Sequence, residues 1–90
     1  MPFKPVDAQD SHAVSLQFLQ TEISTALTFA RIAHDAADTD KRRRNRQSAQ
    51  EGYDTVVRFA PRVALSADES KDLNLGLDEL RRAIDAIPDI

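Results

Sequence analysis

The chain has 90 residues, of which 41% are apolar and 30% charged, and its net charge is −3. A chain this short is expected to form one domain, over 1–90, with a small core and no deep active-site cleft. It has no cysteine, which excludes disulfides and thiolate chemistry, and no stretch as long as the roughly 20 apolar residues of a membrane span. Pro2 and Pro5 predict an extended tail over residues 1–7. These opening residues lack the apolar core of a secretory signal, so we expect a cytoplasmic location.

The first predicted element is a helix over residues 8–37. Apolar residues recur there at alternating steps of three and four, which is typical of a helix that packs along another helix. This stripe consists of Leu16, Leu19, Ile23, Ala26, Ala30, Ala33 and Ala37. Asp7, Asp10 or Ser11 is placed to cap the helix by accepting its free backbone N–H groups.

A second helix is predicted over residues 40–60. If the first helix simply continued, its stripe would become charged, so the phase indicates a break near Asp38-Thr39-Asp40, where a tight turn and a helix cap are expected. Pro61 has no backbone N–H to donate and therefore ends or kinks this helix. The apolar stripe of the second helix consists of Ala49, Tyr53, Val56, Ala60 and Val63.

A third helix is predicted over residues 67–87. Ser66 and Glu69 have the spacing of a capping box, in which each side chain accepts a hydrogen bond from the backbone of the other residue. Pro88 closes the helix. Its stripe consists of Leu73, Leu77, Leu80, Ile84 and Ile87. The three stripes together predict an all-α fold, an antiparallel three-helix bundle.

Charge is distributed unevenly among the three segments. Residues 1–40 hold two basic and six acidic side chains, residues 41–62 seven basic and two acidic, and residues 63–90 three basic and seven acidic. In an up-down-up bundle, the basic start of the second helix is expected to lie near the acidic ends of the other two. The acidic residues at those ends are Asp35, Asp38, Asp85 and Asp89.

One run of positive charge is a candidate surface for nucleic acid or another polyanion. The basic cluster consists of Lys41, Arg42, Arg43, Arg44 and Arg46. Such a run is able to neutralise phosphates, but no aromatic residue lies within it to stack on a base, and the chain as a whole is acidic. A solvated or internally paired face and an acidic protein partner are the alternatives.

The first helix carries more apolar residues than one stripe requires. Phe29, Ile32 and Ala36 lie beside the stripe, so this half of the helix is apolar nearly all round. Coverage by two neighbouring helices explains part of this excess. The remainder makes Phe29, Ile32 and Ala36 a candidate surface for a protein partner or a second copy of the chain. Phe18 and Leu75 also fall outside their stripes.

No residue pattern points to catalysis, a metal or a cofactor. His12 and His34 are separated by about 33 Å of helix and cannot share a site within one chain. His34 and Asp38 have the spacing of two ligands on one helical face, but no third ligand accompanies them. A nucleophilic triad and a glycine-rich phosphate loop are both missing. We therefore expect a non-enzymatic protein.

Part of the second helix resembles a known repeat family. Ala49, Tyr53, Val56 and Pro61 have the spacing of the second helix of a tetratricopeptide repeat, although no second copy follows at a 34-residue period. The three-helix layout, with a tyrosine in the second helix, is similar to that of microtubule-interacting-and-transport domains. Both resemblances imply a protein that binds other proteins, and neither supplies ligand-contacting residues.

The expected function is accordingly a non-catalytic helical module for protein–protein interaction or self-association. It would use the Phe29, Ile32 and Ala36 surface or a groove between helices. Binding of nucleic acid or another polyanion through the basic cluster is the alternative.

Overall fold

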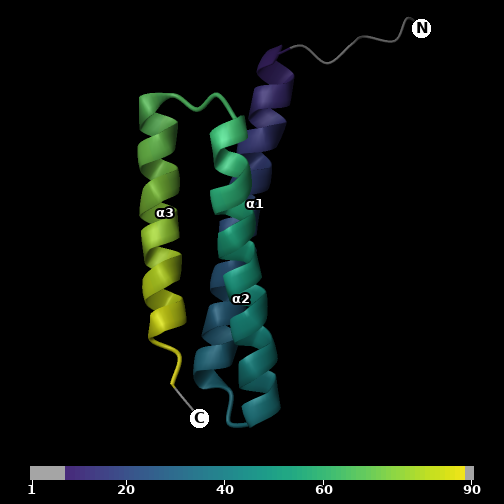
Figure 1. Cartoon of the computed structure of the whole chain (residues 1–90), viewed down its shortest axis with the longest axis vertical. Helices are drawn as coiled ribbons and strands as arrows, with labels where there is room; N and C mark the ends of the chain where they lie inside the picture. Colours follow the sequence, from purple (N-terminus) through teal and green to yellow (C-terminus); the bar gives the residue numbers. More distant parts are fainter. Residues whose placement is uncertain (1–7, 89–90) are drawn as a thin grey trace, which may run out of the picture.

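The computed structural model describes residues 8–88, and it confirms the predicted all-α, three-helix architecture. Its elements are α1 (Ala8–Asp35), α2 (Thr39–Phe59), the short 3-10 turn η1 (Ala60–Arg62) and α3 (Ala67–Asp85). α1 and α3 run in the same direction and α2 runs against both, as Figure 1 shows. The predicted tail over 1–7, the possible cap Asp7, and Asp89, one of the acids expected near the basic start of the second helix, lie outside the described residues.

The connection between α1 and α2 begins two residues earlier than predicted. α1 ends at Asp35, and the side chain of Asp38 caps α2 by accepting the backbone N–H of Lys41 at 2.8 Å. Because the helical phase is lost after Asp35, Ala36 is buried and Ala37 is exposed. The assignment of Ala37 to the buried stripe was therefore wrong.

The second helix changes form at its predicted end. Regular α-helix stops at Phe59, and the chain tightens into η1, which holds Pro61. The turn closes with a hydrogen bond from the Val63 N–H to the Ala60 carbonyl, at 3.1 Å. Pro61 thus lies where its missing N–H breaks no α-helical hydrogen bond.

The capping box of α3 is confirmed in both directions. The Glu69 N–H donates to the Ser66 hydroxyl at 3.1 Å, and the Ser66 N–H donates to a Glu69 carboxylate oxygen at 2.9 Å. α3 ends at Asp85, two residues before the predicted end, although Ile87 remains buried. The predicted stripe of α3 is buried along its whole length.

Two adjoining groups of buried side chains form the core. One joins the alanines of α1 to the end of α3 and contains Ala26, Ala30, Ala33, Ala49, Leu80, Ile84 and Ile87. The other lies nearer the start of α1 and contains Leu19, Ile23, Val56, Leu73 and Leu77. Of the predicted stripes, Leu16, Tyr53, Ala60 and Val63 are only half-buried. α1 packs more extensively on α2 than on α3, because small side chains let the first two helices approach closely.

Candidate functional site

The basic cluster at the start of α2 divides into a structural member and a surface group. Arg42 is half-buried, and its guanidinium donates a 2.6 Å hydrogen bond to the carbonyl of Ala36, just past the end of α1. Carbonyls at a helix C-terminus lack partners within the helix and carry partial negative charge. Arg42 therefore fastens the end of α1 to α2 and does not contribute to a free basic surface.

The other members of the basic cluster are exposed. Arg43 lies 3.8 Å from Asp40 on its own helix, which is a weak surface pair. Arg43 and Arg46 line a hollow between α2 and α3 together with Asp85, one of the acids expected nearby. Lys41 and Arg44 remain available to a ligand on the outer surface.

The other acids expected to pair with this cluster have different contacts. Asp38 caps α2, and Asp35 lies 3.1 Å from His34. His34 and Asp38, the two candidate metal ligands, thus each contact another residue. Of the acids expected near the cluster, Asp85 lies in the same hollow as Arg43 and Arg46.

The candidate surface of Phe29, Ile32 and Ala36 is divided by the packing. Ala36 is buried, and Phe29 is half-buried against the core. Ile32 is the most accessible of the three, with 36% of its surface exposed. These three side chains form no continuous apolar face. A partner would contact only part of the Phe29 ring and the side chain of Ile32.

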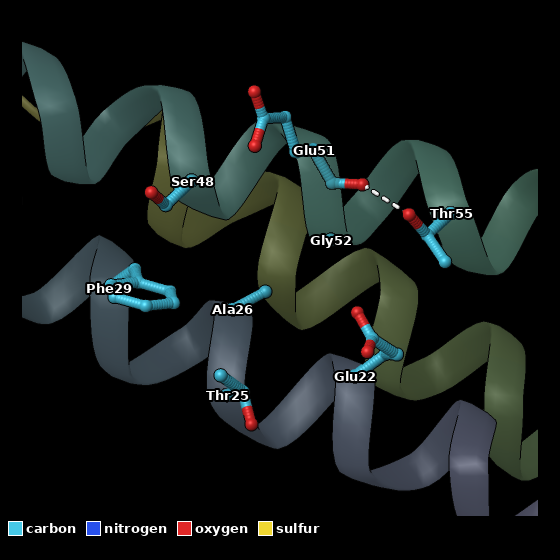
Figure 2. A pocket seen from close by; sticks show the side chains of 8 residues that line it. All are labelled: Glu22, Thr25, Ala26, Phe29, Ser48, Glu51, Gly52 and Thr55. Atoms are coloured by element: carbon cyan, nitrogen blue, oxygen red, sulfur yellow. Dashed lines mark hydrogen bonds between the residues drawn. The ribbon is translucent and has the colours of Figure 1, made fainter.

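Phe29 borders a shallow hollow between α1 and α2, which Figure 2 shows from close by. Ala26 and Gly52 form its floor, where the two helices come into contact. Glu22 and Glu51 lie on opposite sides, and the Glu51 carboxylate points away from α1. The polar groups along this hollow therefore do not converge on one point, as a catalytic site requires.

A different apolar surface lies at the opposite end of the α1–α2 pair. The rings of Phe18 and Phe59 meet edge to face, with their centres 6.4 Å apart, and the Arg62 guanidinium lies 5.3 Å from the centre of the Phe59 ring. Val14 lies beside them and is 65% exposed, while the accessible fractions of Phe18 and Phe59 are 46% and 36%. We call Val14, Phe18, Phe59 and Arg62 the aromatic corner; together with neighbouring residues they line a hollow of about 410 Å³.

Sequence reasoning found only one part of the aromatic corner. Phe18 was noted as an apolar residue outside its stripe, but nothing in the pattern connected it to Phe59. Val14 and Phe59 each look like an isolated apolar residue on a polar helix face. The surface arises only because the start of α1 lies beside the end of α2 (Figure 1).

A second unanticipated contact joins α1 to the start of α3. The His12 Nε2 lies 2.9 and 3.0 Å from the two carboxylate oxygens of Glu69. The backbone N–H of Ser66 and, to a lesser degree, His12 hold the pKa of the Glu69 carboxyl below its ordinary value, because both stabilise the charged form. Glu69 thus serves both the capping box and the packing of α3 on α1.

Among residues 8–88, no group of three or more His, Asp or Glu side chains is placed to hold a metal ion. Within the same range, no helix is both long and apolar enough to cross a membrane. Comparison of the chain with protein-family models, curated proteins and solved structures finds no match.

Proposed function

We propose that this chain is a non-catalytic, cytoplasmic helical module that binds protein, and that the aromatic corner is the contact surface. The occupant we propose is a second copy of the chain. The observation that carries the proposal is the Phe18–Phe59 pair, two exposed rings already held edge to face beside an apolar hollow. The weak resemblance of α2 to tetratricopeptide repeats agrees with a binding role.

The chemistry of the aromatic corner suits a contact that excludes water. Aromatic side chains and arginine are over-represented among residues that dominate binding energy. An aromatic ring also covers a large area with little loss of conformational freedom. Phe18 and Phe59 restrict one another before any partner arrives, so part of the ordering cost is met within the monomer. Arg62 provides a charged edge next to the apolar rings.

The direct test is the oligomeric state measured by light scattering over a range of protein concentrations. We expect the wild-type chain to self-associate and Phe18→Ala to weaken the association about tenfold or more, which corresponds to about 1.4 kcal/mol. Leu75→Ala is the matched control, because Leu75 is 57% exposed on α3, away from the aromatic corner. A chain that stays monomeric up to about 1 mM contradicts the proposal. Phe18→Ala and Leu75→Ala weakening self-association equally would also contradict it.

Binding of a polyanion through the basic cluster is a second candidate function. It is favoured by the exposure of Lys41 and Arg44 at the N-terminus of α2, where the helix dipole adds positive potential. Fluorescence anisotropy with labelled DNA and RNA tests it. The affinity should fall steeply with salt, and Lys41→Ala together with Arg44→Ala should lower both the affinity and the salt dependence. No binding at low salt would eliminate this function.

A further inference from the structure

The groove between α1 and α3 is distinct from the aromatic corner and differs from it in charge. It encloses about 400 Å³. Leu16, Ile23 and Leu27 line it from α1, and Leu73 lines it from α3. The three α1 residues are separated by seven and four positions, so they form an apolar strip along about three helical turns, or roughly 16 Å, with the exposed side chains of Gln20 and Ser24 beside it.

The floor of this groove is continuous with the core. Ile23 and Leu73 are buried, whereas Leu16 and Leu27 are half-buried and retain surface that faces the groove. α1 and α3 run in the same direction (Figure 1), and the residues that line the groove are spread along both helices. A ligand that covers the strip completely must itself be elongated and apolar on one face.

The wall on the α3 side is acidic. Asp72 and Glu79 line the groove seven positions apart, and both are exposed. Neither has a hydrogen bond or ion pair with another residue of the described chain. A third acid, Glu69, closes one end of the groove, but His12 and the Ser66 backbone already occupy its carboxylate. The groove therefore combines an apolar floor with two uncompensated negative charges on one side.

Gly76 lies between the two acids on the groove side of α3, and no side chain projects into the groove there. A Cβ atom at Gly76 would stand 3.3 Å from the Cδ1 of Ile23, so α3 lies close to the floor at this point. Because Gly76 has no side chain on the groove side of α3, a ligand is able to reach the apolar strip and both carboxylates together. Asp72 and Glu79 are seven positions apart, which is about two helical turns. Two residues seven positions apart on one face of a bound helix would have the same separation.

From this geometry we infer that the α1–α3 groove binds an amphipathic α-helix of another protein, with apolar residues against the floor and Lys or Arg along the edge that faces α3. The helical form follows from the apolar residues that recur at helical spacing along the groove between α1 and α3. The basic edge follows from Asp72 and Glu79, because like charges opposite them would cost binding energy. The same carboxylates repel nucleic acid and anionic lipid from this face.

The inference is tested with two synthetic peptides of about 14 residues, roughly four helical turns. Both carry leucines at helical spacing, and they differ only in having Lys or Glu beside the leucines. We expect fluorescence anisotropy to show binding of the Lys peptide, with an affinity that falls with salt, and at least tenfold weaker binding of the Glu peptide. Equal binding of both peptides, or no binding of the Lys peptide, would overturn the inference.

Matched variants separate a groove contact from general attraction to an acidic protein. The double variant Asp72→Asn with Glu79→Gln should lower the affinity for the Lys peptide about tenfold. Asp78→Asn with Asp85→Asn removes the same charge from α3 outside the groove and should change the affinity less than twofold. Circular dichroism confirms that both variants remain helical. Equal losses in the two double variants would also overturn the inference.

The position of the peptide distinguishes this inference from the proposed function. Amide chemical shifts should change along α1 from Leu16 to Leu27 and along α3 around Gly76. Phe18→Ala, which tests the aromatic corner, should leave the peptide affinity unchanged. Shifts confined to the aromatic corner would refute the groove and support the other surface. Peptide binding by a strictly monomeric chain would support the groove and contradict self-association.

Discussion

The Cβ atom of Ala26 lies 2.7 Å from the position that a Cβ atom on Gly52 would occupy. This distance is too short for two carbon atoms, so α1 and α2 approach one another closely only because residue 52 has no side chain. Figure 2 shows the two residues facing each other on the floor of the hollow. The Gly52–Ala26 contact thus sets the distance between the two helices that make the most extensive interface.

Gly52→Ala is expected to destabilise the protein despite the higher helix propensity of alanine. The higher helix propensity of alanine would add about 1 kcal/mol to the free energy of unfolding. The new methyl group, however, must push α1 and α2 apart, and such overpacking of a core costs typically about 1–3 kcal/mol. The net effect should be a loss of up to about 2 kcal/mol in the free energy of unfolding. Urea denaturation followed by circular dichroism measures it.

Gly76→Ala is the control for that prediction. A Cβ atom there would meet only the side chain of Ile23, with its Cδ1 at 3.3 Å and its Cγ2 at 3.4 Å, and no backbone atom. The gain in helix propensity should therefore offset the contact, and the free energy of unfolding should stay the same or rise by up to about 1 kcal/mol. The double variant Ala26→Gly with Gly52→Ala should recover part of the loss, because it removes the clashing methyl group. If Gly52→Ala matches Gly76→Ala in stability, the close contact is not as described.

Arg42 and Arg44 are expected to respond differently to the same substitution. Arg42→Ala removes the hydrogen bond to the Ala36 carbonyl and should lower the free energy of unfolding by about 1–2 kcal/mol. Arg44→Ala changes an exposed side chain and should stay within about 0.5 kcal/mol of the wild type. Thermal denaturation of the two variants compares them at equal change in net charge. Similar melting temperatures would mean that Arg42 does not fasten α1 to α2.

Glu69 is expected to make stability depend on pH in the acidic range. Its pKa is lower in the folded protein than in the unfolded chain, so its charged form stabilises the fold at neutral pH. That contribution should disappear as the pH falls through the lowered pKa, where the folded state takes up the proton. Glu69→Gln should therefore be less stable than the wild type at pH 7, and the difference should shrink toward pH 3. Denaturation curves of both proteins at a series of pH values test this. A difference in the free energy of unfolding that stays constant from pH 7 to pH 3 would contradict this account.

Much of the fold is predictable because helical periodicity reports burial directly. The stripe of α3 is buried from Leu73 to Ile87, and the Ser66–Glu69 capping box marks the start of the helix. A capping box and a stripe are local features, formed by residues within a few turns of each other, so the sequence contains all the information they need. The error at Ala37 arose because periodicity shows where a stripe lies but not where the last turn unwinds.

The candidate sites were harder to predict, since the sequence does not state how the exposed parts of different helices meet. Arg42 looked like its basic neighbours, and only its contact with Ala36 separates it from them. Phe29 looked like part of an exposed face, yet it packs against the core. In both cases the deciding fact is the rotation of a helix about its axis within the bundle.

By itself, the sequence of this protein determined three helices, their approximate limits and the residues that form the core, because these depend on patterns within one helix. The tertiary structure alone decided which side chains from different helices lie together. His12 and Glu69 are 57 positions apart in the chain, yet their side chains are in contact. The aromatic corner and the α1–α3 groove are also each formed by residues of separate helices. Both depend on interhelical distance and orientation, which follow from the packing of all three helices at once.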